Sequence, residues 1–189
     1  AQRLVTGRWP ASVSLRTPKG LLVEVPLEDC RMEGPSAVCG VRKDGGDDVD
    51  QTTGALVQAA VSPSVQPGIS IEGGPGVGRV TRPGLDQPVG AAAINRVPRQ
   101  MIREQVASLC RQTGYKGGLQ VTISVPAGEQ IAQRTFNPRL GIEGGISILG
   151  TSGIVEPMSI QAMIDTLQIE LRQTAAQGHR GVILTPGNY

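Results

Sequence analysis

Residues 137–159 constrain the fold more than any other segment; they read Asn-Pro-Arg-Leu-Gly-Ile-Glu-Gly-Gly-Ile-Ser-Ile-Leu-Gly-Thr-Ser-Gly-Ile-Val-Glu-Pro-Met-Ser. A short apolar strand is joined here to two glycine-rich turns that carry hydroxyl and amide groups. Gly144, Gly145, Gly150 and Gly153 permit backbone angles closed to other residues, and their N–H groups can approach a bound group. The segment predicts either a ligand-binding loop or a tight crossover between packed elements, with equal support for the two.

The composition indicates a folded protein without a nucleic-acid platform. The chain has 189 residues, 39% of them apolar, and its 26 glycines and 14 prolines fall in discrete clusters between apolar runs. A net charge of +2 with interspersed signs provides no basic stripe for a phosphate backbone. A protein that binds single-stranded nucleic acid needs aromatic side chains on which the bases stack, and this chain has few of them. They are Trp9, Tyr115, Phe136 and Tyr189.

Cysteine usage and hydropathy predict a cytoplasmic protein that does not enter a membrane. Cys30, Cys39 and Cys110 are odd in number and form no CxxC pair, which favours reduced thiols over a disulfide framework or a zinc site. The longest apolar runs are far too short to span a bilayer. The single histidine, His179, falls at the end of a predicted helix, where a cation is favourable.

The periodicities predict strands first and helices later. Residues 13–17 and 21–25 flank Pro18-Lys-Gly20 and predict a hairpin, while residues 98–114 and 160–178 predict two long amphipathic helices. The run at 55–61 fits strand or helix equally well. Further strands are predicted at residues 37–42, 69–71, 79–81, 118–125 and 181–185, and a short helix within residues 126–132.

The expected fold class is α+β, with mixed and antiparallel sheets and two long helices. The final run at 181–185 has the composition of a buried parallel strand. A parallel strand without a following helix cannot complete a domain, so we expect a chain cut from a longer protein. The expected division is an α+β domain over residues 1–178 and the first strand and loop of a second α/β domain over residues 179–189.

Residues 69–78, Ile-Ser-Ile-Glu-Gly-Gly-Pro-Gly-Val-Gly, imitate the strand and glycine loop with which many methyltransferases bind S-adenosylmethionine. In that fold a helix begins directly after the loop. Here Arg79-Val-Thr-Arg-Pro-Gly follows and predicts a strand and a proline turn instead. An ordinary Rossmann site is therefore rejected, and no Walker GxxxxGK[ST] motif is present.

Four carboxylates crowd into seven residues, at Asp44, Asp47, Asp48 and Asp50. Their repulsion must be relieved by solvent, a cation or hydrogen-bond donors. An EF-hand needs a glutamate at its twelfth position, where this chain has Ala55. We predict no metal site, and weigh a solvated capping turn slightly above a ligand site.

Arginines gather in the glycine-rich half of the chain, and their planar forks suit ligands that carry carboxylates. Arg103, in mid-helix, is attributed to surface solubility. Glu129 and Glu156 stand at the ends of elements and are candidate acid/base groups, or first-turn helix charges. The other arginines of this set are Arg79, Arg82, Arg96, Arg99, Arg134 and Arg139.

Long ordered motifs give the chain a family resemblance. They are residues 43–50 with Thr53-Gly54, residues 73–85, Gly90, Ala93-Ile-Asn95, residues 97–102, Pro126-Ala-Gly-Glu129 with Ala132, residues 135–142, residues 144–159 and Thr185-Pro-Gly-Asn-Tyr189. In this order they resemble the CbiD family, the cobalt-precorrin-5B (C-1)-methyltransferases of anaerobic cobalamin biosynthesis. Such runs are far more specific than a single glycine motif.

The resemblance implies methyl transfer from S-adenosylmethionine to carbon 1 of a cobalt corrinoid precursor, with Glu129 and Glu156 as candidate catalytic groups. Carboxylates can accept hydrogen bonds from the amino group and the ribose hydroxyls of the methyl donor. Arginines can donate hydrogen bonds to the acetate and propionate groups at the edge of the substrate. The implied cofactor-binding residues are Asp47, Asp48, Gly74, Gly76, Gly78, Thr151 and Ser152. The implied substrate-binding residues are Arg79, Arg82, Asn95, Arg99, Arg134, Asn137 and Arg139.

The chain departs from the family pattern at both ends. A Gly-Tyr-Thr-Thr-Gly type start is absent unless Val5-Thr-Gly7 is its remnant, and the second α/β domain of the family is missing. A non-catalytic corrinoid-binding fragment or degenerate relative is therefore the alternative, and a module for another polycarboxylate is a third reading. Self-association into a homo-oligomer stays open.

Overall fold

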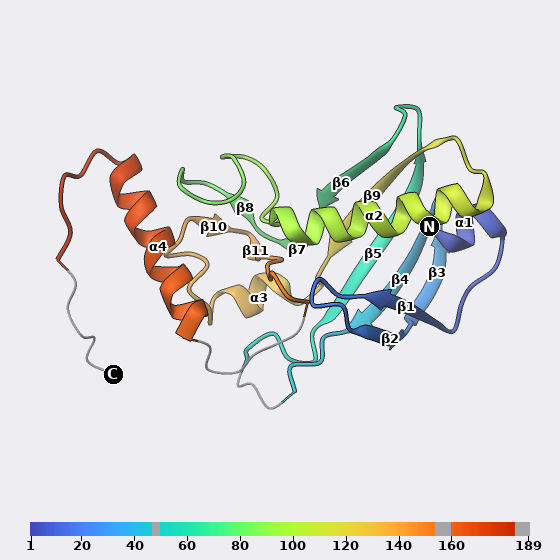
Figure 1. The fold of residues 1–189 in the computed structure, drawn as a ribbon, viewed down its shortest axis with the longest axis horizontal. Coiled ribbons are helices and arrows are strands. Elements are labelled where there is room, and N and C mark those ends of the chain that lie inside the picture. Colours follow the sequence, from blue (N-terminus) through green and yellow to red (C-terminus); the bar gives the residue numbers. More distant parts are fainter. Residues whose placement is uncertain (47–49, 154–159, 184–189) are drawn as a thin grey trace.

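The computed structural model describes residues 1–46, 50–153 and 160–183, and within them it forms an α+β fold, as the sequence predicts (Figure 1). The helices are α1 (Gln2–Thr6), α2 (Arg96–Thr113), α3 (Gly128–Ala132) and α4 (Ile160–Ala176). The longer strands are β1 (Ser12–Arg16), β2 (Leu22–Pro26), β3 (Glu28–Glu33), β4 (Ser36–Arg42), β5 (Leu56–Ser64), β6 (Ile69–Gly73) and β9 (Gly118–Ser124). The two-residue strands are β7 (Gly76–Val77), β8 (Arg79–Val80), β10 (Ile142–Glu143) and β11 (Gly145–Ile146).

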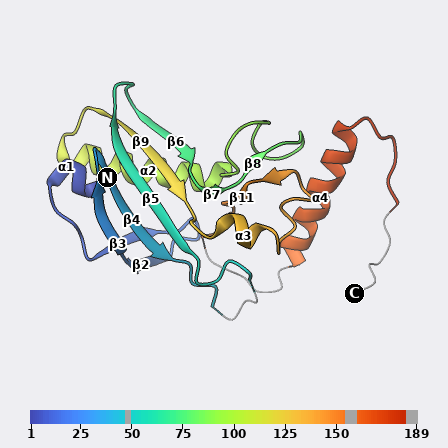
Figure 2. The ribbon, with the colours of Figure 1, turned by 180° about the vertical axis from the view of Figure 1, so that it is seen from behind.

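A five-stranded sheet forms the body of the fold, in the order β3-β4-β5-β9-β6. All neighbours are antiparallel except β6 and β9, which are parallel. Side chains alternate along β9, so that Leu119, Val121 and Ile123 are buried while Gln120 on the opposite face is exposed. Helix α2 crosses the sheet in Figure 1, and the view from behind in Figure 2 shows the other face without a helix.

The ambiguous run at 55–61 is a strand, because β5 pairs along its length with β4 on one side and β9 on the other. The predicted hairpin is confirmed, with β1 and β2 antiparallel around Pro18-Lys-Gly20. Strand β3 and the short helix α1 were not predicted. β3 carries Glu28, Asp29 and Arg31 at the sheet edge, so its sequence lacks the apolar alternation of a strand.

Helix α2 confirms the first long helix, although it begins at Arg96, two residues before the predicted start at Pro98. The side chain of Asp86 accepts a hydrogen bond from the Arg96 N–H at 2.6 Å and so caps the helix from ten residues away. Gly114 ends the helix in the left-handed conformation, at φ 70°.

Helix α4 confirms the second long helix and lies at one end of the molecule (Figure 1). Gln173, 7% exposed, donates a hydrogen bond to the Leu140 carbonyl at 2.6 Å and so ties the helix to the preceding loop. Successive residues of a helix are rotated by about 100°, so Ile164 and Leu171 lie roughly 180–200° from Gln173, on the opposite side of α4. They and Leu167 are 39–41% exposed, so this apolar stripe points away from the contact made by Gln173.

The prediction of a strand at 181–185 is wrong for residues 181–183, the part of this range that the structure describes. Residues 181–183 are exposed and have no regular secondary structure, because no described strand pairs with them. A run of apolar residues forms a buried strand only where a sheet edge receives it. Residues 184 and 185 lie outside the described residues.

Candidate functional site

Three glycine-containing segments meet where the main sheet joins the two-residue strands. Strand β7 runs parallel to β11, and β8 pairs antiparallel with β10. A Cβ on Gly76 would lie 1.8 Å from the Val125 carbonyl oxygen, and one on Gly128 or Gly145 would lie 2.1 or 2.2 Å from the Gly76 oxygen. These three glycines, which we call the glycine junction, allow the backbones to approach more closely than any side chain permits.

Gly74 and Gly78, two of the expected cofactor-binding glycines, have their N–H groups engaged by protein. The Gly74 N–H donates to the Ile123 carbonyl at 2.7 Å and the Gly78 N–H to the Ile146 carbonyl at 2.8 Å. A Cβ on Gly74 would meet the Ser124 hydroxyl at 2.3 Å. Packing alone therefore accounts for glycine at these positions, and neither N–H group is free for a ligand.

Arg99, an expected substrate-binding residue, holds together the segments around the junction. Its Nε donates to the Ile94 carbonyl at 2.7 Å, and its two terminal nitrogens donate to the carbonyls of Ile71 at 2.8 Å and Ala92 at 3.2 Å. All three nitrogens of the guanidinium group are thus engaged with backbone. The arrangement fixes the middle of β6 against the segment that leads into α2.

Asn137 is 9% exposed and plays a similar part on the other side of the junction. Its amide nitrogen donates to the Gly145 carbonyl at 3.4 Å, and its side-chain oxygen accepts from the Ser147 hydroxyl at 3.3 Å. Asn95 precedes α2, and its N–H donates to the Ile148 carbonyl at 2.9 Å, while its side chain makes no capping hydrogen bond. Both residues position loops.

An exposed edge beside the junction gathers Phe136, Arg139 and Arg82, and we call it the Phe136 edge. The Phe136 ring is 66% exposed, and the Arg139 guanidinium carbon lies 5.8 Å from its centre, within cation–π range. Arg82 donates to the Arg139 carbonyl at 3.3 Å, and its stem lies over Gly141, which has φ +74°. Two arginines and an aromatic ring are thus presented to solvent together.

Arg79 lies on β8 opposite Glu143 of β10 and is already paired. Its guanidinium forms an ion pair with Glu72 at 3.3 Å and donates to the Gly90 carbonyl at 3.0 Å. The Thr81 hydroxyl donates to the Glu143 carboxylate at 3.3 Å. A ligand carboxylate would have to compete with Glu72 for Arg79.

The remaining expected site residues are dispersed. Arg134 lines a hollow of about 130 Å³ with Gln51, Gln130 and Ile131. Glu129 is exposed in the first turn of α3, and Thr151 and Ser152 lie in a turn whose Gly153 faces Thr17 and Pro18 of the hairpin. The residues expected at the site that lie outside the described residues are Asp47, Asp48 and Glu156.

The described carboxylates of the acidic cluster are satisfied by protein donors. Asp50 pairs with Lys43 and accepts hydrogen bonds from the N–H and hydroxyl of Thr52, each at 2.8 Å. Burial opposes ionisation of Asp50, but the hydrogen bonds from Lys43 and Thr52 outweigh it and lower its pKa. Asp44 accepts from the Gly46 N–H at 2.9 Å. Among the described residues, no group of three or more His, Cys, Asp or Glu side chains could hold a metal ion.

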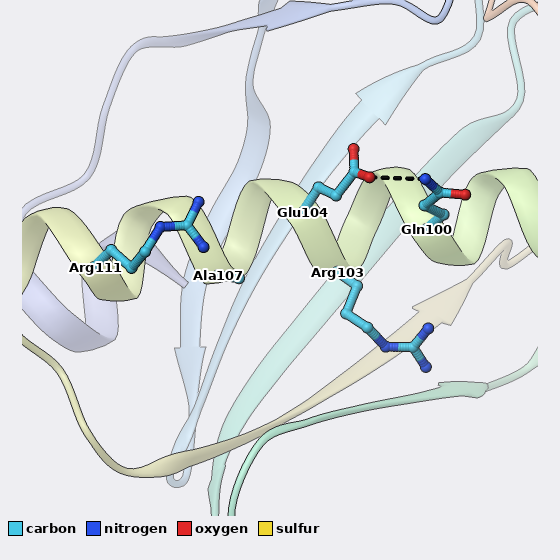
Figure 3. Close-up of a pocket in the computed structure, with 5 residues that line it drawn as sticks. All are labelled: Gln100, Arg103, Glu104, Ala107 and Arg111. Atoms are coloured by element: carbon cyan, nitrogen blue, oxygen red, sulfur yellow. Dashed lines mark hydrogen bonds between the residues drawn. The ribbon is translucent and has the colours of Figure 1, made fainter.

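A second hollow, of about 300 Å³, lies along α2 and includes none of the expected site residues. Figure 3 shows its lining, in which the Gln100 amide donates to the Glu104 carboxylate at 2.8 Å. Arg103 also lines it, on the exposed part of the helix, in keeping with the surface role expected of that residue. In the part of the chain that the structure describes, no helix is long and apolar enough to cross a membrane.

Phe136 is the residue of this site that sequence reasoning missed. It is the single phenylalanine of the chain and lies next to Asn137 in a motif rich in polar residues. The sequence carries no strong signal for Phe136, because a single exposed apolar side chain is common on protein surfaces and only its neighbours in the fold give it meaning.

Comparison with solved structures gives the fold class, since the described fold is similar to that of a solved cobalamin biosynthesis protein. The chain is similar to the crystal structure of the cobalamin biosynthesis protein CbiD from Archaeoglobus fulgidus, with a TM-score of 0.64 and 34% identity, over 89% of this chain and 54% of that one. The CbiD family model matches residues 1–157. The chain belongs to the CbiD family.

Curated relatives carry a common name, cobalt-precorrin-5B C(1)-methyltransferase. The relative from Geobacillus kaustophilus is 52% identical over 184 residues, which are 97% of this chain and 50% of that protein. The relative from Pseudomonas putida strain KT2440 is 48% identical over 188 residues, 100% of this chain and 52% of that protein. The chain spans about half the length of the curated relatives it matches.

Proposed function

We propose that this chain is part of a methyltransferase that moves a methyl group from S-adenosylmethionine to carbon 1 of cobalt-precorrin-5B. The observation that carries the proposal is 52% identity over 97% of the chain to a relative of that name. No comparison favours the alternative, a corrinoid-binding fragment without catalysis. We also propose that the protein acts in the cytoplasm and that it associates with copies of itself.

The Phe136 edge is the part of the described surface that best fits the substrate. A corrinoid precursor is a macrocycle edged by acetate and propionate groups, and the guanidinium groups of Arg139 and Arg82 can bind such carboxylates through paired hydrogen bonds. The exposed Phe136 ring offers an apolar face along which a flat macrocycle can lie. Arg99, whose guanidinium group is engaged by the carbonyls of Ile94, Ile71 and Ala92, is assigned to the scaffold.

The residues expected to hold the methyl donor fit that role only in part. Gly74 and Gly78 lack free N–H groups, so we assign them to the scaffold. Thr151 is an exposed residue. With Ser152, Asp47 and Asp48, it remains our proposed contact to the donor's amino group and ribose. S-adenosylmethionine supplies an electrophilic methyl group when bound.

Positioning is the main contribution that these residues can make to catalysis. Methyl transfer requires the accepting carbon in line with the donor sulfur and methyl, and holding the macrocycle by its carboxylates sets that alignment. A proton leaves only if the accepting carbon carries one, and Glu129 or Glu156 is proposed to accept it. Glu129 is exposed to solvent in the first turn of α3.

A titration with a cobalt corrinoid that carries free carboxylates tests the substrate edge. Loss of one charged hydrogen-bonding partner costs about 1.5–3 kcal/mol, so Arg139→Ala and Arg82→Ala should each weaken binding roughly 10- to 100-fold. Arg103→Ala, on the exposed part of α2, is the matched control and should leave affinity unchanged. Unchanged affinity in Arg139→Ala, or equal losses in all three variants, would remove this edge from the site.

We also propose that a second domain follows residue 178 and packs on the apolar stripe of α4. The curated relatives are about twice as long as the matched region, and Leu167 and Leu171 leave 39–40% of their area exposed here. Amide hydrogens of α4 should then exchange more slowly in a full-length protein than in the 189-residue chain. Equal exchange rates would contradict this packing.

A further inference from the structure

Cys30 on β3 and Cys39 on β4 bring two thiols together across neighbouring strands. Their Sγ atoms lie 2.7 Å apart, and both side chains are half-buried. The β3–β4 pairing shifts register between Glu28 and Arg31, so that a bulge carries Cys30. Asp29 beside it has φ 51°, the one positive value among the described residues other than glycine. The local backbone thus turns Cys30 toward Cys39.

The arrangement is close to that of a bonded pair. A disulfide has an S–S distance of about 2.0 Å, so the two sulfurs must approach by roughly 0.7 Å. Cys30 and Cys39 lie between the paired residues Glu28↔Gly40 and Arg31↔Val38, so the two strands are neighbours on either side of the thiol pair. Cys110, the third thiol, instead packs from α2 against the main core cluster.

We propose that Cys30 and Cys39 form a reversible disulfide by exchange with an oxidised low-molecular-weight thiol of the glutathione disulfide class. One protein thiolate attacks a sulfur of the small disulfide, giving a mixed disulfide and releasing one small thiol, which takes up the proton. The second cysteine loses its proton and attacks the protein-side sulfur, which closes the Cys30–Cys39 bond and releases the second small thiol. Two protein thiols are oxidised and one small disulfide is reduced.

The environment assigns the order of the two attacks. Burial, together with the hydrogen bond and charge of Cys30, raises the pKa of Cys39 to about 12. Cys39 therefore keeps its proton at neutral pH and is the poorer first nucleophile. Cys30 attacks first, and Cys39 resolves the mixed disulfide.

The bond would fasten the outermost strand of the main sheet. Among the described strands, β3 lies at the edge of the sheet and pairs with β4 alone. A cross-link between residues 30 and 39 closes a short loop in the unfolded chain and restricts its freedom. For a domain of this size the melting temperature should rise by about 5 °C on oxidation.

Peptide mapping of the folded 189-residue chain tests the proposal. The chain is incubated with glutathione disulfide, remaining thiols are alkylated, and trypsin cuts at Lys19, Arg31 and Arg42. The expected product is one linked pair, residues 20–31 joined to residues 32–42. Cys110 should be recovered alkylated on its own peptide, as the internal reference.

Two variants make the outcome sharper. Cys30→Ser should give no linked pair, and Cys39, still half-buried, should be modified more slowly than Cys30 is in Cys39→Ser. Cys39→Ser should accumulate the mixed disulfide at Cys30, because no resolving thiol remains. Cys110→Ser should still give the linked pair. Glutathione retained on wild-type Cys30 without cross-linking, faster modification of Cys110, or three unmodified thiols under an oxidant that oxidises a small dithiol would each overturn the proposal.

Discussion

Replacing Gly128 with alanine tests how closely the segments of the glycine junction are packed. The new Cβ would lie 2.1 Å from the Gly76 carbonyl oxygen and 2.8 Å from its carbon. Both atoms belong to backbone, so no side chain can rotate to relieve the contact. Overpacking typically costs about 1–3 kcal/mol, and a rigid contact falls at the upper end, so we expect a loss of about 3 kcal/mol.

Gly144→Ala is the matched control, because it separates backbone strain from contact. Gly144 has φ +76°, but nothing lies within 4 Å of a Cβ built there. Only the left-handed conformation is penalised, at about 1–2 kcal/mol. Gly76→Ala combines φ +74° with a Cβ 1.8 Å from the Val125 oxygen, and should destabilise more than either.

Urea unfolding followed by circular dichroism measures these free energies by linear extrapolation. The predicted order of stability is wild type, Gly144→Ala, Gly128→Ala and then Gly76→Ala. A Gly128→Ala protein within about 0.5 kcal/mol of wild type would refute the packing argument, because ordinary surface substitutions have effects of that size. The glycines would then need another explanation, such as contact with a ligand.

Two further predictions concern Arg99 and Asp50. Arg99→Met leaves three backbone carbonyls without their donor and should lower the free energy of unfolding by about 2–3 kcal/mol. Arg103→Met, the control, should lower it by less than about 0.5 kcal/mol. Equal losses in urea unfolding would contradict the role of Arg99. The pKa of Asp50 is lowered, so its stabilising effect should be present above the unfolded value of about 3.9 and vanish as pH falls through the lower folded value. The stability difference between wild type and Asp50→Asn should therefore be constant at neutral pH and shrink below about pH 4, and a pH-independent difference would refute the assignment.

Local patterns predicted the elements whose signals are local. The apolar face of α2 and its stop at Gly114 came from helical spacing, and the hairpin came from the turn residues Pro18-Lys-Gly20. The prediction of a strand over residues 181–183 was wrong, because no described strand lies beside this apolar run to pair with it. Pairing is a property of the whole sheet and cannot be read from one segment.

The role of single residues was harder to predict than their position. Gly74 and Gly78 have the sequence of a ligand loop, yet segments far apart in the chain take up their N–H groups. Arg99 belongs to an arginine set that suits anionic ligands, and only the tertiary fold brings three carbonyls to it. Phe136 was overlooked because one ring creates no periodic pattern.

A methylation assay tests directly whether the protein that contains this chain is a methyltransferase. A full-length protein that contains this sequence is incubated with S-adenosylmethionine and cobalt-precorrin-5B, and the corrinoid is analysed by mass spectrometry and carbon NMR. The account predicts one added methyl group at carbon 1, formed much more slowly when Arg139 is replaced by alanine at subsaturating substrate. A stable, folded protein that binds the corrinoid but transfers no methyl group would contradict the account and favour the non-catalytic alternative.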